Sequence, residues 1–363
     1  MAAAESHASE VGPSRSAASG SGPLGPLRRW ITVHRAPIAL VVLAVTIPEV
    51  LSGSTPVPAL INPVQLVGLL GFYGAGVLVI RDAAIRFRRG WSMILPLGLA
   101  YGIAEEGIAT KTMVDPASHP AGFLGTYGHW LGVNWVFAVV IALFHAIYSI
   151  ALPILLVRLL YPETVDRPFL SERGVITTLV LFSLAVAIGY FAFDPTYFEG
   201  YAVLAGLAVA IGALVLLAFQ LPRAWLDPPT DAPTLSPRRF GYLGAAYASG
   251  WAFFYLFAPR LIPVPAVVVA GEIATGALAI AVVVRSIGRA RHERHLVMLS
   301  AGLLSWFVPW AIVITFVLGD YLVGFVVFAV FFLVYRLAQR YPDVTLPPPA
   351  APLRGSVDPG RPS

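Results

Sequence analysis

The stretch GVNWVFAVVIALFHAIYSIALPILLV, residues 132–157, carries a single side chain that titrates near neutral pH, His145. A helix needs ~20 apolar residues to cross the ~30 Å hydrocarbon layer of a bilayer. Within that layer every backbone N–H and C=O must pair inside its own segment, so an isolated span has to be helical. The stretch therefore predicts a transmembrane helix, and the rest of the chain repeats its pattern.

Apolar segments of similar length recur along the 363-residue chain, which is 58% hydrophobic and 12% charged. A single soluble core could not bury that much apolar surface, whereas lipid can take the place of the core. The sequence predicts an all-α, polytopic transmembrane helix bundle over 28–341, with disordered cytoplasmic tails at 1–27 and 342–363. The ten predicted spans are 33–52, 63–81, 91–110, 132–157, 174–193, 201–221, 240–258, 264–284, 296–317 and 321–338.

The basic residues test this map, because cytoplasmic loops hold an excess of Lys and Arg. With both termini inside, 22 of the 24 basic residues are cytoplasmic and only Lys111 and Arg260 lie outside. A wrong number of spans would have scrambled this alternation. The arginines also account for the net charge of +5 through contact with anionic lipid. We therefore expect a cell-membrane protein whose partner is the lipid bilayer, and no nucleic acid.

Away from the cytoplasmic ends of the predicted spans, five acidic or histidine side chains fall inside them, namely Glu49, Glu105, Glu106, His145 and Glu272. Each is expensive to insert, by at least ~2.5–3.5 kcal/mol at the centre of a span. Counted from the span ends, all five lie in the outer half or the middle of the bilayer. Such a grouping predicts a polar cavity that opens to the outside.

Each of these residues also has a purely structural interpretation. Glu49 and Lys111 lie near span ends, where their side chains can reach the interface. Glu272 and His145 could instead be paired helix contacts. The adjacent carboxyl groups of Glu105 and Glu106 are harder to explain structurally, although they point about 100° apart on a helix and are not expected to face the same partner.

The fourth span presents a small and polar stripe to its neighbours. Asn134, Ala138, Ala142, His145 and Ser149 follow the 3.6-residue period, and such stripes face other helices. We predict His145 and the two glutamates as candidate catalytic residues. The candidate residues for binding a substrate or ion are Glu105, Glu106, Lys111, Asn134, His145 and Glu272.

The pair Glu105–Glu106, followed by His145 within a later helix, resembles the CAAX-processing and bacteriocin-processing family of intramembrane proteases. That family carries EExxxR, FxxxH and then HxxxN or HxxxD on successive helices. Here the resemblance covers little more than residues 105–145. Thr110 stands at the Arg position, Ile141 stands at the Phe position, and the later spans contain no third motif. The resemblance implies that one glutamate activates water while His145 holds a metal or an oxyanion.

The whole chain also looks like uncharacterised prokaryotic multi-pass membrane proteins that share its AEEG…K segment.

Two functions from different classes remain open. A transporter or permease fits an acidic site in the outer half of the membrane, and a division into five plus five spans would place 91–110 and 264–284 at corresponding positions of an inverted repeat. An intramembrane hydrolase would use Glu105 or Glu106 as the general base and His145 as its partner, with His119 and His129 as further candidate metal ligands. A membrane scaffold is a third alternative. We favour transport because charged sites occur in both halves of the chain. The sequence identifies neither a cofactor nor a metal, and it leaves the small substrate or ion open.

Overall fold

The computed structural model of the chain describes residues 25–229, 231–289 and 292–342. The predicted tails 1–27 and 342–363 fall outside these ranges apart from their inner edges, and the first helix already begins at Gly25. Helices make up about three quarters of the described part, and its one sheet is a two-stranded hairpin. The protein is thus an all-α polytopic bundle, as the sequence predicts.

Ten helical segments follow the predicted spans in order, and several continue through a π-helical turn. The first five are α1 (Gly25–Val45) with η1 (Thr46–Val50); α2 (Pro63–Leu69), η3 (Leu70–Gly74) and α3 (Ala75–Arg86); α4 (Trp91–Gly102) with η4 (Ile103–Ala109); α5 (Trp135–Phe144), η6 (His145–Ala151) and α6 (Leu152–Leu160); and α7 (Glu172–Ala192). The last five are α8 (Tyr201–Gln220); α9 (Pro237–Leu256); α11 (Pro265–Ile287); α12 (Glu293–Leu304), α13 (Phe307–Val313) and η9 (Ile314–Leu318); and α14 (Val323–Arg340).

Short elements occupy the loops. They are the 3₁₀ turns η2 (Val57–Ile61), η5 (Gly122–Gly125), η7 (Pro162–Thr164) and η8 (Arg223–Trp225), the single helical turn α10 (Ala258–Leu261), and the strands β1 (His129–Trp130) and β2 (Val133–Asn134). The two strands pair antiparallel, with His129 opposite Asn134. This hairpin directly precedes the helix that decides the fold.

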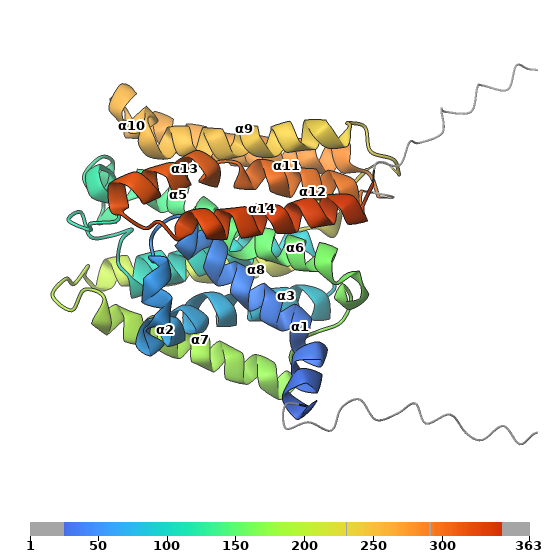
Figure 1. Cartoon of the computed structure of the whole chain (residues 1–363). Coiled ribbons are helices and arrows are strands. Elements are labelled where there is room, and N and C mark those ends of the chain that lie inside the picture. Colours follow the sequence, from blue (N-terminus) through green and yellow to red (C-terminus); the bar gives the residue numbers. More distant parts are fainter. Residues whose placement is uncertain (1–24, 230, 290–291, 343–363) are drawn as a thin grey trace, which may run out of the picture.

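Among the described residues, eight helices are long and apolar enough to cross a membrane. The other two predicted spans form α4–η4, which contains two glutamates, and α9, which begins with two arginines. Both are helices of about the length that a crossing requires, and their polar residues keep them out of the apolar set. The beginning of α1 and the end of α14 lie at the same end of the bundle (Figure 1), as an even number of crossings requires.

The helix α5–η6–α6 forms the centre of the bundle, and 78% of its most apolar window is buried. It packs against α1 and α4 on one side and against α9, α11 and α12 on the other. The equally apolar α7 and α8 are only 6% and 11% buried, so their side chains are left to face lipid. A helix that is hydrophobic all round must be surrounded by apolar material, and here that material is protein for the central helix and lipid for the peripheral ones.

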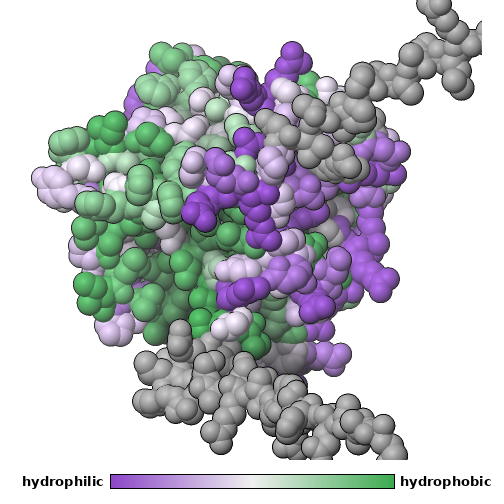
Figure 2. All heavy atoms as spheres, turned by 45° about the vertical axis from the view of Figure 1, so that its right-hand side comes forward, coloured by the Kyte–Doolittle hydropathy of each residue, from purple (hydrophilic) through white to green (hydrophobic). Residues whose placement is uncertain are grey.

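Hydrophilic residues gather at the end of the molecule where α1 begins and α14 ends, and hydrophobic residues cover the adjoining helix flanks (Figure 2). That end carries the arginine-bearing loops, including those that follow α3 and α6. By the positive-inside rule it is the cytoplasmic end, and we use "outer" for the opposite end.

Candidate functional site

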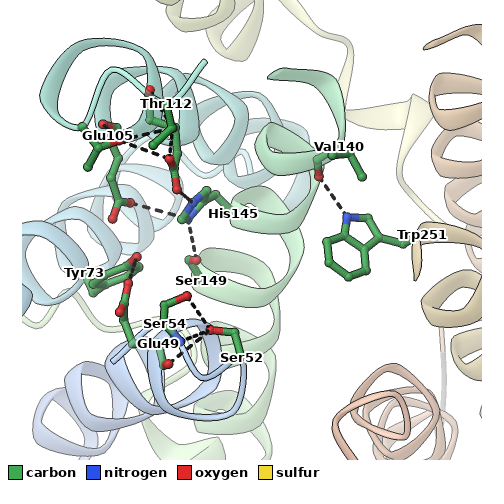
Figure 3. Close-up of polar contacts among 12 residues, drawn as sticks. Glu49, Ser52, Ser54, Tyr73, Glu105, Thr112, Val140, His145, Ser149 and Trp251 are labelled. Carbon is green, nitrogen blue, oxygen red and sulfur yellow. Dashed lines mark hydrogen bonds and ion pairs between the residues drawn. The ribbon is translucent and has the colours of Figure 1, made fainter. Parts of the chain in front are cut away.

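Four chain segments bring ionisable side chains together beside the central helix, and each does so on a π-helical turn. Glu49 lies on η1, Tyr73 on η3, Glu105 and Glu106 on η4, and His145 on η6. π-Helical turns are rare and occur frequently at functional sites. We call these five residues the carboxyl–histidine cluster (Figure 3).

His145 contacts both neighbouring glutamates. Its Nε2 lies 3.0 Å from Glu106 Oε1, and its Nδ1 lies 3.5 Å from Glu105 Oε2. Nδ1 also lies 2.9 Å from the hydroxyl oxygen of Ser149, one turn along the same helix. The expectation that the two glutamates could not face one partner is therefore wrong, because an imidazole ring offers a nitrogen on each of two sides.

The cluster is largely buried. His145 is 2% exposed and Glu105 is 4% exposed, while the side chain of Glu106 keeps 15% of its surface. Among the described residues, neither Glu105 Oε2 nor the buried Tyr101 hydroxyl has a hydrogen-bond partner. Glu105 and Glu106 share one imidazole, so ionisation of both would leave uncompensated negative charge in a low-dielectric site. The arrangement can hold protons and exchange them.

Glu49 meets the cluster through Tyr73. The Tyr73 hydroxyl donates to Glu49 Oε1 at 2.5 Å, and the Thr55 hydroxyl donates to Glu49 Oε2 at 2.5 Å. The Tyr73 ring stacks 6.1 Å from the His145 ring, measured between centroids. The sequence suggested only a span-end position for Glu49 and gave Tyr73 no role. The sequence feature that could have pointed to Tyr73 is its position within a glycine-rich span, where helices pack closely.

A hydrogen-bonded chain leads from the cluster to the outer surface. Glu106 Oε2 accepts hydrogen bonds from Thr110 and Thr112. The amide of Asn134, which is fully buried, donates to the Thr112 carbonyl at 2.9 Å, and Asn134 Oδ1 lies 2.6 Å from Nδ1 of the exposed His129. The predicted binding residue Asn134 therefore lies on the outer hairpin, next to the cluster, rather than in the cluster itself.

Two glycines of α4 set how closely the glutamates approach the histidine. A Cβ added at Gly98 would lie 2.9 Å from Ala146 Cα, and one added at Gly102 would lie 3.1 Å from His145 Cβ and 3.2 Å from Ala142 Cα. Small residues let helices in a membrane pack backbone to backbone. The polar stripe predicted on the fourth span thus packs against α4.

Lys111 acts elsewhere in the outer region. It is 2% exposed with a positive φ of 60°, and its Nζ donates to the carbonyls of Asp194 and Tyr197 at 2.7 and 2.8 Å. These carbonyls belong to the loop between α7 and α8. The structure therefore places this predicted binding residue as a tether for an outer loop.

Glu272 lies apart from the other glutamates. It is 3% exposed on α11, and neither carboxyl oxygen has a hydrogen-bond partner within the described part of the chain. A small void of about 10 Å³ beside it is lined by Leu143, Tyr247 and Trp251. The structure does not bring Glu272 to Glu105 or Glu106, because the central helix stands between them.

No group of three His, Asp or Glu side chains within residues 25–229, 231–289 and 292–342 is arranged to hold a metal ion. His119 and His129 form no such group with the carboxyl–histidine cluster. The donor set around His145 therefore offers hydrogen-bond acceptors and a base, but no metal site in this arrangement.

A cavity opens at the cytoplasmic end, opposite to the predicted outer opening. It encloses about 600 Å³ between α4, the central helix, α9, α11 and α12. Leu143 and Tyr247 line both this cavity and the small void beside Glu272. The molecule thus has a largely buried acidic cluster on one side of its central helix and an open cavity on the other.

The model of an uncharacterized membrane protein family matches residues 38–354 of the chain. No curated protein and no solved structure matches it. These comparisons do not show the resemblance to the CAAX-processing family. The family match identifies a membrane protein and names no activity.

Proposed function

We propose that this chain, which belongs to an uncharacterized membrane protein family, is a proton-coupled transporter of the cell membrane. The observation that carries the proposal is the contact between Glu106 Oε1 and His145 Nε2, 3.0 Å apart inside a largely buried cluster. Intramembrane carboxyl and imidazole groups paired in this way are the usual elements of proton relays in pumps and transporters. Histidine in addition titrates near physiological pH when unperturbed.

Burial favours transport over chemistry at the cluster. A hydrolase must admit both water and a scissile bond to its base. Glu105, His145 and Ser149 are each at most 4% exposed and the Glu106 side chain 15%, and the 600 Å³ cavity is lined by other residues. A proton-coupling site, in contrast, has to be closed while substrate is held elsewhere.

The central helix supplies a physical link between the two sites. Leu143, Ile147 and Ala151 line the cytoplasmic cavity, whereas His145 and Ser149 bond within the cluster. These sets alternate along one helix that changes to π geometry at His145. A shift of this π-helical turn on protonation would move the cavity wall. The turn would then act as the two-state element that coupling between the two sites requires.

Hydrogen bonds tie the cluster to the outer side of the bundle. His129 on the exposed hairpin is joined to Glu106 through Asn134 and Thr112. This link includes an amide group and a backbone carbonyl, which do not relay protons, so it positions Glu106. Protons would reach Glu106 at the part of its side chain that stays exposed, and their inward movement would drive the cargo.

The test uses energised everted vesicles from cells that express the protein, with a pH-sensitive dye. Anionic, neutral and cationic amphiphiles are added in turn. We expect one class to discharge the pH gradient, and Glu106→Gln or His145→Gln to abolish that response while Glu163→Gln, an exposed carboxyl on a cytoplasmic loop, retains it. Responses that are equal in wild type and both cluster variants would contradict the proposal, as would no response to any class.

A hydrolase remains a second candidate because Ser149, His145 and Glu106 form a nucleophile–base–acid chain, an arrangement that recurs on unrelated folds. A fluorophosphonate probe would label Ser149 if that serine is activated. Labelling that is lost in both Ser149→Ala and His145→Gln would favour hydrolysis. Absence of labelling in detergent and in vesicles would remove this candidate.

A further inference from the structure

The walls of the cytoplasmic cavity are apolar, whereas its mouth is positively charged. Its deep part is lined by aliphatic side chains such as Leu143, Ile147, Leu155, Ala279 and Val283. Its volume of about 600 Å³ falls in the ~300–1,000 Å³ range of small-molecule sites. Arginines occupy the mouth, where three cytoplasmic loops meet.

Hydrogen bonds between those loops build the mouth. Arg89 donates to the carbonyl of Leu221 at 3.2 Å, and Arg223 donates back to that of Phe87 at 2.7 Å. A third loop joins them through Arg289, which donates to the Pro228 carbonyl at 2.8 Å. Each of these guanidinium groups keeps further N–H donors, because arginine has five.

The positive charge at the mouth is not neutralised. Five arginines line the cavity against one acid, Asp227. Among the described residues, Arg88 and Arg158 form no side-chain hydrogen bond and no ion pair. His292 also lines the mouth, and burial together with the charge of Arg158 lowers the pKa of this histidine. The arginines at the cavity mouth therefore carry more positive charge than the lining acid Asp227 can balance.

We propose that the cavity binds a membrane amphiphile with a phosphate-type anionic head, which the mouth arginines hold while its apolar chain enters between α6 and α11. Guanidinium groups match phosphate oxygens in pairs, and basic pockets between transmembrane helices on the cytoplasmic side suit anionic lipid heads. A cationic amphiphile would be repelled at the mouth. A soluble anion would leave the aliphatic walls uncovered.

This inference deepens the proposed function by naming the class of its cargo, and the binding step can be measured without transport. Glu106 and His145 lie outside the cavity lining. Their substitution is expected to stop proton coupling and leave lipid binding intact. If the protein binds the lipid but shows no proton-coupled transport, the proposed function is contradicted and the lipid-binding inference stands.

The experiment measures the thermal stability of the purified full-length protein in neutral detergent as each probe is added, because a ligand of the folded state raises the melting temperature with the logarithm of its concentration relative to Kd. The probes are dioleoyl phosphatidic acid, dioleoyl phosphatidylcholine and inorganic phosphate. We expect concentration-dependent stabilisation by phosphatidic acid alone. Arg88→Gln with Arg158→Gln should weaken this binding about tenfold or more, whereas Arg173→Gln, an exposed arginine at the cytoplasmic start of α7, should not.

A second variant tests the apolar part of the site without touching charge. Ala279→Phe fills the deep end of the cavity and should abolish stabilisation by phosphatidic acid while the protein remains folded. Equal stabilisation by phosphatidylcholine, or by inorganic phosphate, would overturn the proposal. So would phosphatidic acid binding that is unchanged in both the arginine pair and Ala279→Phe.

Discussion

Glu106 and His145 lie 39 positions apart in the chain, yet their side chains meet with Oε1 3.0 Å from Nε2. The contact depends on α4 and the central helix approaching at Gly98 and Gly102, and on both residues lying on π-helical turns. It joins the polar network of the outer hairpin to the helix that lines the cytoplasmic cavity.

A double-mutant cycle of Glu106→Gln and His145→Gln should report this contact as a coupling energy. Contacting residues in one hydrogen-bond network couple by about 0.5–3 kcal/mol. The exposed pair Arg35–Glu163, 2.7 Å apart, is the matched control and should give at most about 1 kcal/mol. Unfolding in detergent measures both, and a coupling for Glu106–His145 no larger than the control would contradict the assigned contact.

Gly98→Leu should destabilise the protein by about 1–3 kcal/mol through overpacking, because an added Cβ already lies 2.9 Å from the backbone of Ala146. Gly206→Leu on α8 has nothing within 4 Å of its added Cβ and should be close to neutral. The melting temperatures of the two variants compare these positions. Equal losses would show that the helix approach at Gly98 is not required.

Lys111→Met should loosen the loop between α7 and α8, because two carbonyl groups lose their cationic donor. Both carbonyl groups belong to half-buried residues, so each should cost less than the ~1–3 kcal/mol of a fully buried unpaired acceptor. Hydrogen exchange at residues 193–200 should accelerate in this variant, while exchange in α9 stays unchanged. Unaltered exchange in the loop would remove the tethering role.

The chain contains no cysteine, so an introduced one reports its own side of the membrane. A membrane-impermeant thiol reagent added to intact cells should label Thr126→Cys in the outer hairpin region. Asp166→Cys, in the loop after α6, should react only after permeabilisation. The reverse pattern would invert the orientation that the arginines predict.

Sequence reasoning located the helices and the acidic pair but not the neighbours of that pair. Apolar length and arginine alternation placed all ten helical segments, because lipid imposes these patterns on the chain directly. Glu105, Glu106 and His145 stood out since ionisable groups are costly in a span. Tyr73 and Thr112 did not, because a tyrosine within a helix and a threonine in a turn are both common.

The separation of Glu272 from the cluster was also beyond the sequence. Which helices become neighbours depends on side-chain packing across the bundle, and the central helix lies between α4 and α11. The cavity escaped prediction for the same reason. Its wall residues are ordinary Leu, Ile and Val side chains on five separate helices, and its arginines look like any others on cytoplasmic loops. The five-plus-five repeat stays a prediction.

The central claim is that protonation of the cluster moves the wall of the cytoplasmic cavity. Spin labels on Asp166→Cys and Arg285→Cys, which are both exposed and lie at the cytoplasmic ends of α6 and α11, measure this directly as an inter-label distance. In the wild-type background the distance distribution should shift between acidic and alkaline pH, and Glu106→Gln should fix it in one form. A distribution that does not change with pH in the wild-type background, or that shifts equally in Glu106→Gln, would contradict the claim.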